Sequence, residues 1–126
     1  MTSEGTFDIG LAPQDDAGHP AGRMLIDKTY SGGMTGRGTG QMISKRVHNG
    51  PSVYFAVEEF TGSVDGLSGA FTLLHRGFMD QQAQSLDITI LEGSGSGGLA
   101  GVSGSMQITQ EEGVHQYSLE YELPGQ

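Results

Sequence analysis

Glu58 and His75 are the two side chains whose types and positions point most directly to chemistry. Each is an ionisable residue inside an otherwise apolar run, over residues 52–60 and 70–78. A carboxylate beside an imidazole can move protons, because the carboxylate orients and charges the ring, or takes a proton itself while the ring donates one. The two residues therefore form a candidate catalytic site for general acid/base chemistry if the fold brings them together.

The turn between the two runs predicts that they do meet. It contains Asp65 and Gly66, and an Asp-Gly pair between apolar residues is a strong signal for a two-residue β-hairpin turn. Such a turn places Ala56 opposite His75, on the same face as Glu58. Glu58 and His75 are then diagonal neighbours, about 7–8 Å apart at the backbone and within side-chain reach.

The same register divides the sheet residues into an inner and an outer set. We expect the interior to contain Tyr54, Glu58, Phe60, Phe71, Leu73, His75, Leu86, Ile88, Tyr117 and Leu119. We expect Glu59, Thr72 and Arg76 to face outward. A three-residue loop with a bulge at the turn would shift the register by one residue and reverse both assignments.

Enclosure among apolar side chains would change the protonation of Glu58. A carboxyl group that loses hydration has a raised pKa, whereas a charged His75 nearby would lower the pKa again, and the two groups would titrate as a coupled pair. Because the placement is diagonal, we expect desolvation to prevail and the pKa of Glu58 to be raised. The plainer interpretations are that Glu58 lies at a rim or balances a nearby cation, and that His75 is a core histidine bonded to a backbone carbonyl.

Other side chains are candidates for ligand contact. We expect the ligand-binding set to be Tyr54, Phe60, Phe71, Leu73, Tyr117 and His115, with wall or rim packing as the alternative for the tyrosines and His115. Lys28 would suit a Schiff base if it pointed inward, but an outward rung with Asp27 is the simpler interpretation. The histidines show neither His-x-His nor His-x-x-x-His spacing, so we expect no metal site and no cofactor.

Alternation with a period of two predicts strands along the whole chain, and no window shows a convincing helical period. The expected strands are residues 4–11, 22–31, 34–45, 51–63, 67–79, 84–93, 99–110 and 113–123. The connections are too short for parallel crossovers, so we predict an antiparallel meander. Strands bent at closely spaced glycines close most naturally into a barrel, which removes sheet edges and, with eight strands, holds side chains or one small ligand.

Composition restricts the classes of function. The 126 residues suit one domain, residues 1–126, and 15 acidic against 6 basic residues give a net charge of −9. Without a cationic cluster to neutralise phosphates, nucleic-acid binding is not expected, and the same charge repels an anionic membrane surface. The sequence has no cysteine, no signal-peptide pattern and no apolar run of ~20 residues, so we expect a cytoplasmic protein.

Several blocks of the sequence recur, in order, in a known family. They are residues 27–32, 54–58, 60–62, 69–75, 84–86, 95–104 and 115–117. Together they resemble the small bacterial proteins grouped as domain of unknown function 3224 (DUF3224), over nearly the whole chain. That family resembles the allene oxide cyclase barrel, which implies an all-β fold, an eight-stranded antiparallel closed calycin-like barrel with a ligand-sized interior. The catalytic residues of allene oxide cyclase have no clear counterpart here, and none is carried over.

Two functions fit these observations. The first is a cofactor-independent isomerase, cyclase or lyase that acts on a small apolar molecule in the barrel cavity through Glu58 and His75. The second is a lipocalin-like binding or carrier protein, in which the same residues orient a ligand. The resemblance to a family of small barrels, more than any residue pattern, implies a homodimer. Leu74 and Phe78 fall on the outer face, where adjacent apolar groups often mark a partner surface.

Overall fold

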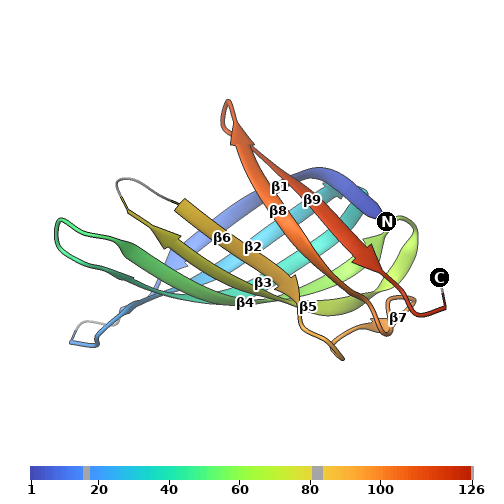
Figure 1. The fold of residues 1–126 in the computed structure, drawn as a ribbon, viewed down its shortest axis with the longest axis horizontal. Coiled ribbons are helices and arrows are strands. Elements are labelled where there is room, and N and C mark those ends of the chain that lie inside the picture. The colour runs from blue at the N-terminus through green and yellow to red at the C-terminus, as the bar shows by residue number, and fades with distance from the viewer. Residues whose placement is uncertain (16–17, 81–83, 126) are drawn as a thin grey trace.

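The computed structural model describes residues 1–15, 18–80 and 84–125, and the regular structure of these residues is β-strand (Figure 1). The strands are β1 (Thr2–Pro13), β2 (Gly22–Gly32), β3 (Met34–Arg46), β4 (Ser52–Val64), β5 (Leu67–Met79), β6 (Gln84–Ile90), β7 (Ser96–Gly97), β8 (Ser103–Glu111) and β9 (Val114–Glu122). Among the described residues there is no helix of the length and apolarity that crossing a membrane would require.

Eight of these strands close into an antiparallel barrel. Neighbours pair in the order β4-β3-β2-β1-β9-β8-β6-β5, and the pairing of β4 with β5 closes the ring. The two-residue β7 is additional to the ring and pairs with β5 at Gly69 and Ala70. The predicted all-β fold, an eight-stranded antiparallel closed barrel, is therefore confirmed, and β7 is a strand that the sequence pattern does not predict.

Strand boundaries follow the predicted ranges closely, except between β6 and β8. The expected strand over 84–93 ends at Ile90, and the expected strand over 99–110 loses its first residues to a turn. Gly93 and Gly101 have positive φ angles of 87° and 78°, so the backbone turns where extended chain was expected. The alternation of small residues between Ile90 and Ser103 resembles that of a strand, but the glycines adopt turn conformations there and interrupt the extended chain.

Asp65 and Gly66 form the two-residue turn that the sequence predicts. Both have a left-handed backbone, with φ angles of 49° and 88°, as the type I′ hairpin turn requires. Pairing of β4 with β5 then runs without a bulge from the residues that flank the turn to Ala56 opposite His75 and beyond. This register turns Glu58 into the barrel, so the predicted inward assignment is confirmed.

The interior is packed at one end of the barrel and partly exposed at the other. At the packed end, the rings of Phe60 and Phe71 lie 5.1 Å apart and are almost fully buried, and Leu99 and Val102 from the turn before β8 close this end. We call the other end the open end, because inward side chains there are only half-buried. They are Met24, Met42, Ser44, Tyr54, Leu86, Ile108 and His115.

The outer face departs from prediction at one residue. Glu59 and Arg76 are exposed, as expected, but Thr72 is only 7% exposed although its register places it on the outer face. Its N–H donates to Ser94 Oγ at 3.0 Å, and its carbonyl accepts from the N–H of Leu91 at 2.9 Å. The turn that follows β6 therefore lies against Thr72, and the expectation of an exposed Thr72 is wrong.

Candidate functional site

Glu58, in the middle of β4, lies at the centre of a buried polar cluster. Its side chain is 0% exposed, and donors from β2 and β5 surround its carboxylate. Lys28 Nζ and His75 Nε2 lie 3.0 and 2.9 Å from Glu58 Oε1, and the Tyr30 hydroxyl donates to Oε2 at 2.5 Å. We call these four residues the Glu58 cluster. The predicted meeting of Glu58 with His75 is present, and their catalytic role stays a prediction.

Glu58 is held in its ionised form. Burial by itself raises the pKa of this carboxyl, but the hydrogen bond from His75, the charge of Lys28 and the hydrogen bond from Tyr30 together outweigh burial and lower the pKa to about 2. The expected raised pKa is therefore wrong. The hairpin register alone predicts one partner for Glu58, whereas the closed barrel supplies three. Burial and the adjacent carboxylate raise the pKa of the Tyr30 phenol, so this hydroxyl remains a donor.

Lys28 points into the barrel, so the predicted outward rung with Asp27 is wrong. The Lys28 side chain is 4% exposed, and its ammonium lies 4.7 Å from the centre of the Phe7 ring, which is a cation–π contact. Asp27 is the outward residue of the two and pairs with Arg37 at 2.6 Å. Inside the barrel, Glu58 compensates the charge that Lys28 brings.

Sequence reasoning missed Tyr30 for the same reason that it misplaced Lys28. In β2, the buried residues Ile26, Lys28 and Tyr30 alternate with exposed neighbours. That is the period-two pattern of a half-buried strand, with a lysine at one apolar position. The period-two pattern of β2 by itself assigns Lys28 and Tyr30 to the inner face, despite the charge of the lysine. A buried Glu58 on that face needs such a partner.

Glycine in β3 makes room for the carboxylate. Gly38 pairs with Lys28 on one side and with Phe60 on the other, so it lies in the wall against which Glu58 packs. A Cβ atom at Gly38 would lie 2.1 Å from Glu58 Oε2 and 3.0 Å from the Tyr30 ring. Any side chain at this position would therefore displace the carboxylate from its donors.

We expect Gly38→Ala to lower the free energy of unfolding by about 1–3 kcal/mol, because the added methyl group overpacks the Glu58 cluster. Gly10→Ala is the matched control. A Cβ atom at Gly10, in β1, would be no closer than 3.8 Å to the nearest atom, the Asp27 carbonyl oxygen. Urea unfolding followed by circular dichroism compares the two variants, and equal stabilities would contradict the tight fit at Gly38.

The remaining predicted site residues lie at two different levels. Phe60, Phe71 and Leu73 belong to the packed core, 0–1% exposed. Tyr54 and His115 are half-buried at the open end, and burial raises the pKa of the Tyr54 phenol. The Glu58 cluster therefore lies between the packed core and the open end.

Tyr117 serves the wall of the barrel. Its hydroxyl accepts from the Met34 N–H at 2.7 Å and donates to the Ser31 carbonyl at 2.9 Å, so both functions of the hydroxyl are satisfied by backbone groups. Its ring packs edge-on against Tyr30, at 5.4 Å between ring centres. Tyr117 thereby supports the Glu58 cluster through its contact with the ring of Tyr30.

The Glu58 cluster offers a carboxylate and an imidazole but has an ammonium group beside them. No group of three or more His, Asp or Glu side chains that could hold a metal ion occurs among the described residues. Within the Glu58 cluster, Lys28 already supplies the positive charge that neutralises the carboxylate. The chemistry that these residues can perform is therefore that of fixed charges, hydrogen-bond donors and a histidine ring.

Comparison with known proteins places this barrel in a family. The family model described as "Protein of unknown function (DUF3224)" matches residues 3–121. The chain belongs to the DUF3224 family. It is similar to the crystal structure of a DUF3224 protein of unknown function from Shewanella oneidensis MR-1, with 32% sequence identity and a TM-score of 0.93 over 100% of this chain and 98% of that chain. No curated protein matches the chain.

Membership in DUF3224 confirms the resemblance that the sequence blocks carry. The two DUF3224 chains share the barrel over their full lengths, so the fold is common to both. The description of the family names no reaction or ligand. A function for this DUF3224 barrel must therefore come from its own side chains, and the further likeness to allene oxide cyclase stays a prediction.

Proposed function

We propose that this DUF3224 barrel binds a small, largely apolar molecule at its open end, with the polar part of the molecule directed toward the Glu58 cluster. The observation that carries the proposal is the row of inward apolar side chains that remain half-buried next to buried, charged groups. Met42 and Leu86 belong to this row, and His75, 8% exposed, is the member of the Glu58 cluster nearest to solvent. Apolar walls with a few convergent polar groups are typical of small-molecule sites.

Ionisation of Glu58 favours binding over catalysis by this carboxylate. A general base works best when its pKa lies near the working pH, and the pKa of Glu58 is lowered to about 2. Its oxygens also accept from Lys28, Tyr30 and His75. A carboxylate in this state is a weak base, but it fixes three donors in place, which suits the recognition of a ligand's polar group.

One observation keeps a catalytic role open for His75. Its Nε2 atom lies 2.9 Å from Glu58 Oε1, so the carboxylate orients the ring as carboxylates orient catalytic histidines. In this second candidate function, a cofactor-independent isomerase, cyclase or lyase, His75 would exchange the proton and Glu58 would position it. The earlier assignment of Glu58 as base or acid would then pass to His75.

Native mass spectrometry of the freshly purified protein and titration with the neutral apolar dye phenylnaphthylamine test the binding proposal. We expect mass spectrometry to detect a retained small molecule, and dye fluorescence to increase on binding. Leu86→Glu should weaken the affinity for the dye by about tenfold or more, because a charge then occupies the open end. Val114→Glu, at an exposed position of β9, should leave dye affinity unchanged. Dye binding that is absent, or unaffected by Leu86→Glu, would refute the proposal.

Two variants then separate a carrier from an enzyme, using the molecule identified by its mass. In a carrier, Glu58→Gln and His75→Gln alter the affinity and leave the molecule chemically unchanged in both the wild type and the variants. In an enzyme, the wild type converts the molecule, and His75→Gln abolishes conversion while binding survives. Circular dichroism establishes that each variant is folded before either result is read.

A further inference from the structure

A band of exposed apolar side chains crosses the outside of the barrel. It lies on the outer face of the same wall whose inner face carries Glu58. It consists of Leu25, Ile43, Phe55, Val57, Leu74 and Phe78, each between 36% and 50% exposed. Strand pairing makes these residues neighbours, since Ile43 lies opposite Phe55 and Val57 lies opposite Leu74. We call these six residues the outer band. It includes both residues that the sequence analysis connects with a dimer, Leu74 and Phe78.

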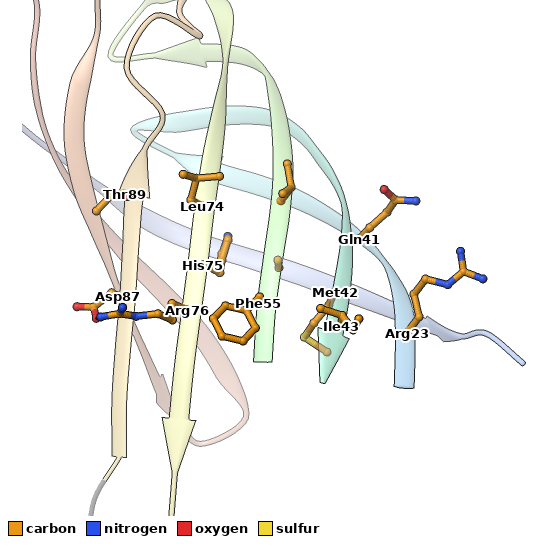
Figure 2. Close-up of a pocket in the computed structure, with 12 residues that line it drawn as sticks. Arg23, Gln41, Met42, Ile43, Phe55, Leu74, His75, Arg76, Asp87 and Thr89 are labelled. Atoms are coloured by element: carbon orange, nitrogen blue, oxygen red, sulfur yellow. The ribbon is translucent and has the colours of Figure 1, made fainter. Parts of the chain in front are cut away.

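Four residues of the outer band, Ile43, Phe55, Val57 and Leu74, line a groove of about 920 Å³ that runs across β2 to β6 (Figure 2). In the close-up, Phe55, Ile43 and Leu74 project from three adjacent strands, and Arg23 and Arg76 lie beside them. These positions alternate along each strand with inward ones, and three of the inward residues, Met42, Ala56 and His75, also border the groove.

The size of the outer band indicates a protein partner. Strands lie ~4.8 Å apart and residues of one face ~6.8 Å apart, so an apolar area over several strands and rows measures roughly 15–20 Å in each direction. Soluble monomers rarely leave a contiguous patch of a few hundred Å² exposed without a function. An apolar centre surrounded by charged side chains is the usual composition of an interface between proteins.

Charges at the two ends of the outer band have opposite sign. At one end, Lys45 lies opposite Val53 in the strand pairing. At the other end, Asp27 and Glu59 both pair with Thr39. Asp27 forms an ion pair with Arg37, whereas Glu59 accepts a hydrogen bond from the neutral Thr72 hydroxyl. The surface is therefore basic toward Lys45 and acidic toward Glu59.

We propose that a second copy of this chain packs on the outer band and forms a two-fold symmetric dimer. For two sheets packed face to face, the two-fold axis lies in the interface. An axis parallel to the strands would place the basic end of one copy on the basic end of the other. An axis across the strands, between the rows of Phe55 and Val57, places Lys45 near the partner's Glu59 and Phe55 near the partner's Val57. Opposite charges and apolar groups then meet, so the dimer has this second axis.

Light scattering at micromolar concentration tests the proposal. We expect the wild type to have twice the 13.2 kDa chain mass, and Phe55→Glu, which buries like charges next to the axis, to have the mass of one chain with an unchanged β-sheet circular dichroism spectrum. Val114→Glu, which adds the same charge at another exposed apolar residue, should remain a dimer. A wild-type monomer, or a dimer that Phe55→Glu does not affect, would overturn the proposal.

A charge exchange tests the orientation and does not require the loss of any apolar group. Lys45→Glu and Glu59→Lys should each weaken dimerisation by about tenfold, because each places like charges across the interface. The double variant Lys45→Glu/Glu59→Lys should restore the wild-type dissociation constant. Failure of the double variant to recover would overturn the axis across the strands. None of these results depends on whether the open end binds a ligand.

Discussion

Replacing Lys28 with methionine is expected to lower the free energy of unfolding by about 3–5 kcal/mol, because the charge of Glu58 then stays buried without its cation. Glu58 is 0% exposed and Lys28 is 4% exposed, so water reaches neither group to compensate the loss. Tyr30 and His75 would still donate hydrogen bonds to the carboxylate, but the ion pair with Lys28 would be lost. Urea unfolding followed by circular dichroism, at one protein concentration, measures the change.

Two further variants show whether the loss comes from the buried charge. Lys28→Met combined with Glu58→Gln should recover part of the stability, since no buried charge remains and the amide still accepts a hydrogen bond. Arg37→Met removes an ion pair with Asp27 in which both side chains are more than half exposed, and should cost no more than about 1 kcal/mol. Equal losses for Lys28→Met and Arg37→Met would show that burial does not strengthen the Lys28–Glu58 pair.

The sequence specifies the fold and half of the Glu58 cluster through local signals. Asp65 and Gly66 determine the turn, the turn determines the register, and the register turns Glu58 and His75 inward. Each step uses residues close together in the chain, where one geometry is strongly preferred. A pair of residues 17 positions apart could therefore be placed in contact without any knowledge of the other strands.

The other half of the Glu58 cluster depends on strands for which the sequence has no comparable turn signal. Lys28 is 30 residues from Glu58, and which face it takes follows from the pairing of β2 with β3 and of β3 with β4. Viewed alone, a lysine next to Asp27 favours solvent. Only the inward carboxylate makes burial of Lys28 favourable, and this mutual dependence is a property of the closed barrel.

Thr72 and the outer band show the same limit on the outside of the barrel. The alternation in β5 correctly assigns Thr72 to the outer face, but a period of two contains no information about which loop returns to cover it. The same alternation assigns Leu74 and Phe78 outward, and no loop covers them to the same extent, since they are 36% and 39% exposed. Sequence periodicity determines the face of a residue, while tertiary packing determines its exposure.

Acid should destabilise the barrel through Glu58 between about pH 5 and pH 2. Its carboxyl has an ordinary pKa of 4.5, which applies to the unfolded chain, and a pKa of about 2 in the fold. The folded state therefore binds this proton less readily than the unfolded state. The stabilisation is fully present above pH 4.5 and is lost as the pH falls toward 2, and the difference between the two pKa values corresponds to roughly 3 kcal/mol.

Neighbouring residues provide a matched comparison for this pH dependence. The chain has 15 acidic residues, so the pH profile of the wild type alone does not isolate Glu58. We expect Glu59→Gln, which changes an exposed carboxylate in the next position, to keep the wild-type fall in the free energy of unfolding between pH 5 and pH 2. Glu58→Gln should be less stable than the wild type at neutral pH, and the difference should shrink as the pH falls, because the wild type alone loses this contribution.

Direct titration of the carboxyl carbon by carbon-13 NMR separates the sources of the lowered pKa. In the wild type, Glu58 should titrate near pH 2, and in His75→Ala its pKa should move upward, because one of the hydrogen bonds that favour the carboxylate is gone. Lys28 and Tyr30 would still oppose the effect of burial in that variant. A wild-type value at or above 4.5 would mean that burial prevails over the three donors, and Glu58 would then be neutral through much of the acid range. Glu58 would then make no contribution to the loss of stability in acid, and Lys28→Met would lower the free energy of unfolding far less than expected for a buried ion pair.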